Sequence, residues 1–160
     1  MGEELFRKET GDLFRRAAMN RKQAAEIKHP SLNGKRVLFA EDEVTAAHMM
    51  FRILSAQGIR AKRAENGHSA VEMFRASEEN YYSAVILDIH MPIMDGLEAA
   101  KTIREMGRAD SFCIPIIALT ASEAEDDQRL SKEAGMTSHL TKPIEPEMLY
   151  RTLEQLMPRN

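Results

Sequence analysis

The chain has 160 residues, of which 43% are hydrophobic, a formal net charge of −3 at pH 7 and one cysteine. This length suits one domain with a substantial core and some additional chain. No apolar run approaches the length of a membrane span, and no secretory signal is visible. The lone Cys113 cannot form an internal disulfide, so we expect a cytoplasmic globular protein without membrane contact, in which Cys113 fills part of the core.

The charge is distributed unevenly along the chain. Residues 1–36 hold nine Lys/Arg and five Asp/Glu, a net charge of +4, whereas the remainder holds thirteen and twenty, a net charge of −7. A general nucleic-acid-binding domain needs a basic face, so the acidic remainder argues against nucleic acid as a partner. The leading basic segment is short, and a solvated helix face accounts for it.

The first 34 residues differ from the rest in pattern. Residues 3–28 contain no proline, and an interrupted a/d seam of apolar residues predicts a helix with weak coiled-coil character. Residues 29–34, His-Pro-Ser-Leu-Asn-Gly, have the composition of a linker. We therefore assign residues 1–34 to an N-terminal helical segment and linker, and residues 35–160 to the main domain. The segment is either a connector from a larger parent protein or an addition to the expressed chain.

From residue 35 onward, short apolar runs alternate with amphipathic segments, which is typical of a parallel sheet covered by helices on both faces. The second strand is the most polar and belongs at an edge of the sheet. The predicted strands are residues 37–40, 59–65, 83–89, 114–119 and 138–141, and the predicted helices are residues 44–57, 69–78, 95–106, 122–134 and 145–157.

Local signals set several of these boundaries. Gly58 and Gly135 are expected to end helices in the left-handed conformation. Two capping boxes are predicted at helix starts, one from Ser69 with Glu72 and one from Ser122 with Glu125. In the last helix, helical spacing predicts that four apolar residues are buried, namely Met148, Leu149, Leu153 and Leu156.

Polar residues follow four of the predicted strands. Because parallel strands point the same way, their carboxyl ends meet at one edge, where open α/β sheets build their sites. The central strand, Ala-Val-Ile-Leu-Asp-Ile, is apolar enough to be buried on both faces and still ends in a carboxylate. The residues gathered at this edge are Glu41, Asp42, Asp88, Thr120 and Lys142.

These residue types suit phosphoryl chemistry. Three carboxylates in one cleft repel one another unless a cation binds between them, and hard oxygen ligands favour Mg²⁺. A hydroxyl and an ammonium opposite the acids would bind phosphoryl oxygens. The set suits an Asp that attacks phosphorus and becomes an aspartyl phosphate. Each residue alone could be a cap or a surface charge, but this explanation accounts poorly for the whole set.

Four separated motifs resemble, in order and register, those of the receiver domain of two-component response regulators, over about residues 35–157. The resemblance implies a flavodoxin-like (βα)5 fold, a doubly wound parallel sheet with strand order 2-1-3-4-5. The motifs are Glu41-Asp42, the ten residues 87–96 (Leu-Asp-Ile-His-Met-Pro-Ile-Met-Asp-Gly), Ala-Leu-Thr-Ala at 118–121 and Lys142-Pro143.

The resemblance also implies a role for each acidic residue. Asp88 is the phosphoacceptor, and it takes a phosphoryl group from a histidine on a partner kinase or a histidine phosphotransfer domain. Asp42 ligates Mg²⁺ directly, whereas Glu41, which replaces the commoner Asp, acts through water. Asp88 and the backbone carbonyl of His90 complete the protein's share of the metal ligands.

Other positions follow from the same resemblance. Thr120 and Lys142 contact the phosphoryl oxygens, the small Ala121 leaves room for them, and the Lys142-Pro143 peptide bond is cis. The His90 side chain either ligates the metal or lines the mouth of the cleft. His139 occupies the position of an aromatic residue that turns inward on activation in this family, and it is either such a rotating group or a static, partly exposed one.

The leading functional hypothesis is a phosphorylation-controlled switch or relay whose catalysis is limited to its own phosphorylation and dephosphorylation. The entry to the first strand and His139 most resemble the C-terminal receiver of a hybrid sensor histidine kinase, and a stand-alone regulator is the alternative. A haloacid-dehalogenase-like phosphatase also uses an Asp nucleophile, but it places that Asp after the first strand with an acid two residues later. A binding module with an inactive site is the third hypothesis. The oligomeric state stays open.

Overall fold

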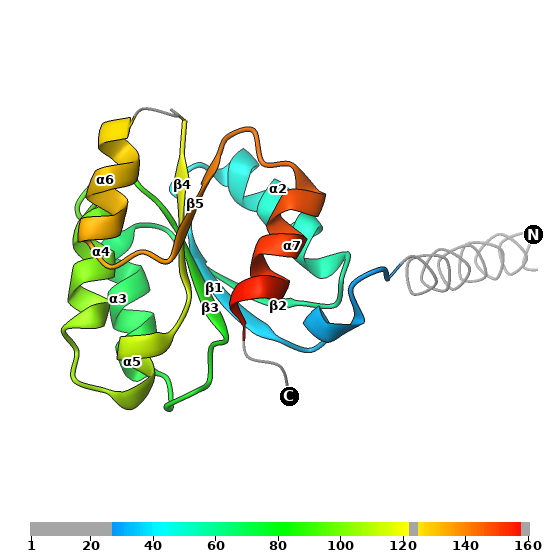
Figure 1. Ribbon diagram of the computed structural model, residues 1–160, viewed down its shortest axis with the longest axis horizontal. Helices are drawn as coiled ribbons and strands as arrows, with labels where there is room; N and C mark the ends of the chain where they lie inside the picture. The colour runs from blue at the N-terminus through cyan, green and yellow to red at the C-terminus, as the bar shows by residue number, and fades with distance from the viewer. Residues whose placement is uncertain (1–26, 122–124, 158–160) are drawn as a thin grey trace, which may run out of the picture.

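The computed structural model describes residues 27–121 and 125–157, so most of the predicted helix over residues 3–28, and the predicted cap Ser122, lie outside the described residues. A five-stranded parallel sheet in the order β2-β1-β3-β4-β5 forms the centre of the molecule (Figure 1). This order confirms the predicted flavodoxin-like fold. The strands are β1 (Arg36–Ala40), β2 (Arg60–Ala64), β3 (Ala84–Asp88), β4 (Ile116–Thr120) and β5 (Ser138–Thr141).

Helices cover both faces of the sheet and divide the core into two halves (Figure 1). α2 and α7 lie on one face together with the short 3-10 helix η1, while α3, α4 and α6 lie on the other. No helix in residues 27–121 and 125–157 is long and apolar enough to cross a membrane. The helical elements are η1 (Pro30–Leu32), α2 (Val44–Ser55), α3 (Gly67–Ala76), α4 (Gly96–Arg104), α5 (Ala109–Cys113), α6 (Glu125–Glu133) and α7 (Pro146–Leu156).

The interior strands β3 and β4 are covered on both faces. Every residue of β3 and β4 is buried, as the continuous apolar runs predict for strands packed on both faces. β2, by contrast, alternates between exposed and partly buried residues and lies at the edge of the sheet, as predicted. Gly58 and Gly135 end their helices with positive φ angles of 75° and 90°, again as predicted.

Several predictions of local structure are wrong, and the first concerns the start of α3. α3 is capped by Asn66, whose side chain accepts a hydrogen bond of 2.8 Å from the amide of Ser69, so Ser69 is not the cap. Glu72 forms an ion pair with Arg75 one turn further along instead of closing a capping box. The helix therefore begins two residues earlier than predicted.

The second error concerns residues 109–113, which form the unpredicted helix α5. Its single turn has no apolar periodicity that a sequence pattern can detect, and it delays the start of β4 to Ile116. Cys113 is the last residue of this helix and is exposed, so it does not fill the core. Met148 is exposed as well, because α7 turns Leu149, Tyr150 and Leu153 toward the sheet.

The predicted linker packs against the domain. Leu32 of η1 is buried in the half of the core that α2 and α7 cover. The buried side chain of Gln57 accepts hydrogen bonds of 3.0 Å from the backbone amides of Lys28 and His29. We therefore propose that the folding unit begins by Lys28, seven residues before the boundary expected from composition.

His29 connects the segment before β1 to α7 through its side chain. Its ring lies between Glu147, 3.0 Å from Nε2, and Glu154, which contacts Nδ1. It also packs against the ring of Tyr150 at a centroid distance of 5.2 Å. A doubly protonated imidazole can donate one hydrogen bond to each of the two carboxylates.

We predict that His29→Ala lowers the free energy of unfolding of the whole chain by about 1 kcal/mol, because it removes the ring contacts with Tyr150 and with two partly exposed carboxylates. His48→Ala, at an exposed position of α2, is the matched control and should change it by less than about 0.5 kcal/mol. Urea unfolding monitored by circular dichroism measures both. Equal midpoints for the two variants would contradict the role given to His29.

Candidate functional site

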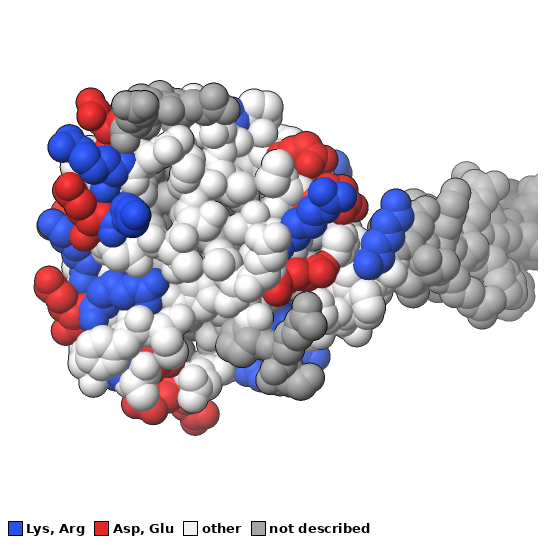
Figure 2. Space-filling view, in the orientation of Figure 1, with Lys and Arg blue, Asp and Glu red and all other residues white. Residues whose placement is uncertain are grey.

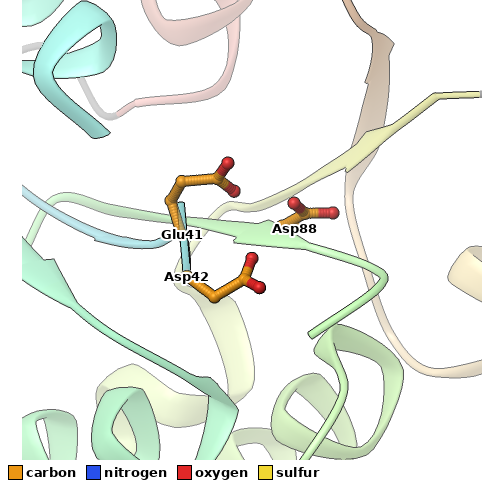
Figure 3. Close-up of side chains that lie close together, drawn as sticks. All are labelled: Glu41, Asp42 and Asp88. Carbon is orange, nitrogen blue, oxygen red and sulfur yellow. The ribbon is translucent and has the colours of Figure 1, made fainter. Parts of the chain in front are cut away.

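Three carboxylates converge at the carboxyl edge of the sheet (Figure 3). Glu41 and Asp42 directly follow β1, and Asp88 is the last residue of β3. Each offers one oxygen, and these oxygens lie within 4.8 Å of one another. Glu41 and Asp88 are only 4% and 6% exposed, whereas Asp42 faces solvent. The predicted acidic residues are therefore brought together in the structure.

Lys142 supplies the opposite charge. Its Nζ donates to Asp88 Oδ2 at 2.7 Å and lies 3.3 Å from Glu41 Oε2. It follows β5 directly, and the Lys142-Pro143 peptide bond is cis, as the resemblance implies. Burial lowers the pKa of the Lys142 ammonium, but hydrogen bonds and charges from Asp88 and Glu41 outweigh burial and raise it, so Lys142 is cationic at neutral pH.

The surroundings of Glu41 shift its pKa. Burial raises the pKa of Glu41 from 4.5 to about 7, and the hydrogen bond and negative charge of Asp88 act in the same direction. Lys142 opposes this rise without cancelling it. One ammonium thus partly compensates the charge of two buried carboxyl groups. A cation bound between them would favour the charged form of both.

Backbone contacts hold the acidic residues in place. The amide of His90 donates to Asp88 Oδ1 at 3.1 Å. The guanidinium of Arg63 donates to the carbonyls of Glu41 and Asp42 at 3.0 and 3.2 Å. The role of Arg63 has no local signal in the sequence, because it depends on the pairing of β2 with β1.

The loop after β3 folds tightly under the site. The amide of Gly96 donates to the carbonyl of Ile89 at 3.0 Å, and a Cβ at Gly96 would overlap the carbonyl oxygen of Asp88. Asp95 caps α4 by accepting a hydrogen bond from the amide of Glu98. Gly96 therefore allows the loop to pack closely against the backbone of Asp88, where a residue with a Cβ would clash.

Thr120 ends β4 at the same edge of the sheet and is 1% exposed. Its hydroxyl donates to Asp127 Oδ2 of α6 at 3.2 Å. Ala121 follows it and is exposed. This hydrogen bond joins two residues that are seven positions apart in the sequence, and sequence reasoning did not identify it.

The two histidines for which the sequence suggested a role in the site, His90 and His139, occupy different environments. The His90 side chain is exposed, and it is not in the three-carboxylate group, which is the only such cluster of possible metal ligands within the described residues. His139 of β5 is partly buried and pairs in register with Ala118 of the neighbouring β4. It lines a shallow surface hollow of about 320 Å³ together with residues including Ile144 and Met148.

The donor set fits a hard divalent cation. Carboxylate oxygens from Glu41, Asp42 and Asp88 can share one ion, and the exposure of Asp42 leaves positions for water or phosphate. Softer metals prefer sulfur or nitrogen ligands, and neither belongs to this group of three.

Comparison with known protein families identifies the family that shares these residues. The model of the response regulator receiver domain matches residues 37–154. The match covers most of the chain, and the chain belongs to this family.

Among curated relatives, hybrid signal transduction histidine kinase I of Dictyostelium discoideum is 33% identical over 130 residues. The peroxide stress-activated histidine kinase mak1 of Schizosaccharomyces pombe is 34% identical over 136 residues. These alignments cover 80% and 83% of this chain but only 8% of each relative, so the chain corresponds to a small part of those proteins.

Two solved structures are informative. The receiver domain of sensor histidine kinase PA1611 from Pseudomonas aeruginosa has a TM-score of 0.69, 29% identity and coverage of 77% of this chain and 97% of its own, and it holds a magnesium ion in the active-site cleft. The receiver domain of the Saccharomyces cerevisiae response regulator Ssk1, solved with the histidine phosphotransfer protein Ypd1, has a TM-score of 0.69, 27% identity and coverage of 79% and 90%.

The raised pKa of Glu41 predicts a pH dependence of stability without metal. The folded state binds this proton more tightly than the unfolded state, so the contribution to stability is present below about pH 4.5 and is lost as pH rises through about 7. In chelator, wild type should lose on the order of 3 kcal/mol relative to Glu41→Gln between these limits.

Urea unfolding of both proteins at several pH values measures this difference. A stability difference that stays constant from pH 4.5 to pH 8 would show that Glu41 titrates normally.

Proposed function

We propose that Asp88 accepts a phosphoryl group from a phosphohistidine with the help of Mg²⁺. The observation that carries this proposal is the placement of Asp88, which lies beside Glu41 and Asp42 and is bound by Lys142 at 2.7 Å. A carboxylate oxygen of Asp88 attacks phosphorus, the phosphorus–nitrogen bond of the donor histidine breaks, and the imidazole keeps the electron pair and takes up a proton.

Residues of the site then stabilise the product. Asp42 and Asp88 would hold Mg²⁺ directly and Glu41 would act through water, and the ion would neutralise negative charge at the phosphoryl group. The Lys142 ammonium and the Thr120 hydroxyl bind phosphoryl oxygens, and the exposed Ala121 leaves space for them. The carbonyl of His90 completes the protein's metal ligands, while its side chain lines the mouth of the cleft.

We propose a histidine phosphotransfer domain or a histidine kinase as the partner, and the Ypd1–Ssk1 complex of a related receiver supports this choice. The named relatives support an origin in a hybrid sensor histidine kinase, of which this chain is the receiver. A stand-alone regulator is the alternative. Histidine kinases take their phosphoryl group from ATP, which is available in the cytoplasm. We accordingly propose that the domain lies in the cytoplasm.

The phosphatase alternative has less support. A haloacid-dehalogenase-like enzyme would carry its nucleophile after β1 and an acid two residues further on. Here the nucleophile follows β3, and the residue two positions on is His90. The family match over residues 37–154 points the same way. Hydrolysis of small phosphomonoesters with turnover would revive this alternative.

We propose that phosphorylation also changes a surface. An aspartyl phosphate draws the Thr120 hydroxyl toward it through a charge-assisted hydrogen bond, and His139 on the adjacent strand turns into the vacated space. The responsive face comprises α6, β5 and α7. Figure 2 shows few charged side chains over the band between α6 and α7, which suits contact with a partner.

We predict that a small phosphodonor with Mg²⁺ adds one phosphoryl group to the wild-type chain, and that Asp88→Asn abolishes the addition. Intact-mass measurement gives the number of groups, and the label should be stable in acid and labile in base. Asp95→Asn is the matched control, because Asn also caps a helix well, and it should be labelled like wild type. Full labelling of Asp88→Asn would overturn the assignment.

We also predict that Asp42→Asn raises the Mg²⁺ concentration needed for phosphorylation more than Glu41→Gln does. A directly ligating carboxylate stabilises the ion more than one acting through water, and losses of about tenfold or more are typical when a ligand is removed. Titration of the initial phosphorylation rate with Mg²⁺ tests the ranking. Equal losses, or a larger loss for Glu41→Gln, would reverse the roles of the two acids.

A further inference from the structure

The contact between Thr120 and Asp127 has a consequence for switching. The Thr120 hydroxyl, which is buried at the end of β4, donates to Asp127 Oδ2 at 3.2 Å. A hydroxyl has one proton and can donate one hydrogen bond at a time. Donation to Asp127 and donation to a phosphoryl oxygen on Asp88 therefore exclude each other.

We propose that Asp127 is a positioning residue that holds Thr120 in the unphosphorylated arrangement and so sets how readily the domain switches. This inference rests on the proposed function, since it requires a phosphoryl group at Asp88 as the competing acceptor. Both acceptors are anionic, so one charge-assisted hydrogen bond replaces another, and the carboxylate of Asp127 offsets part of what the phosphoryl group gains.

The neighbouring acid on α6 has no such role. Asp126 is 84% exposed and lies 3.6 Å from Arg129 on the same helix. Asp127 is partly buried, and its backbone carbonyl also accepts a hydrogen bond of 2.7 Å from Ser131 within α6. Adjacent carboxylates with equal charge thus differ in whether they reach Thr120, and Asp126 provides a matched control for net charge and helix stability.

The effect follows from population shift. A contact made only in the unphosphorylated arrangement lowers the apparent affinity for any ligand that requires the other arrangement. Loss of the Asp127 acceptor should therefore tighten binding of a phosphoryl mimic, and an amide, which accepts a weaker hydrogen bond than a carboxylate, should have an intermediate effect.

The experiment is a titration of beryllofluoride with Mg²⁺ into the whole chain, followed by amide resonances. Asp127→Ala should increase the apparent affinity by roughly three- to tenfold. Asp127→Asn should give a smaller increase, and Asp126→Ala should match wild type. In a Thr120→Val background, which lacks the hydroxyl, Asp127→Ala should have no effect.

A second readout separates positioning from general loosening of the fold. Without beryllofluoride, the amide resonance of Thr120 in Asp127→Ala should move along the line that joins the free and bound positions of wild type. Unchanged affinity in Asp127→Ala, or an equal gain in Asp126→Ala or in the Thr120→Val background, would overturn the inference. A wild-type chain that binds no beryllofluoride would instead contradict the proposed function.

Discussion

The site depends on the electrostatic balance between one ammonium and two buried carboxyl groups. Asp88 and Glu41 lie almost entirely out of solvent, and Lys142 is bound to the first at 2.7 Å and to the second at 3.3 Å. An unpaired buried charge costs several kcal/mol, so the metal-free domain needs this lysine to hold its acids together. Burial and the charge of Asp88 raise the pKa of Glu41 despite Lys142, so one ammonium does not fully compensate the two carboxyl groups. A bound divalent cation would supply the missing positive charge, which would release Lys142 for its proposed contact with a phosphoryl oxygen.

This balance requires the complete sheet. Glu41 follows β1, Asp88 ends β3 and Lys142 follows β5, so the three charges meet only when strands that are distant in sequence pair in the order β2-β1-β3-β4-β5. The full burial of β3 and β4 lets those strands end in a carboxylate and a hydroxyl that are shielded from water. Electrostatic interactions are stronger in such surroundings than in bulk solvent.

The sequence was sufficient for the parts that depend on local pattern. Continuous apolar runs identified the interior strands, and the polar residues at the strand ends, Asp88 and Thr120 among them, identified the edge that carries the site. Contacts between separate elements were not predictable in this way, which explains why Arg63, Asp127 and the packing of His29 on α7 were missed. Asn66 was missed as a cap because Ser69 and Glu72 matched the capping box, and α5 was missed because a single turn has no periodicity. Met148 shows that helical spacing defines a stripe but leaves its rotation uncertain by about one residue.

A crystal structure of the whole chain with Mg²⁺ and beryllofluoride would test the central claim most directly. In that structure we expect beryllium bonded to a carboxylate oxygen of Asp88 and a metal ion beside Asp42 and Asp88. Lys142 Nζ should have moved from Asp88 Oδ2 to a fluoride, and the Thr120 hydroxyl should have left Asp127 for another. A structure at saturating beryllofluoride in which Asp88 is unmodified and Lys142 still lies 2.7 Å from its carboxylate would contradict the account.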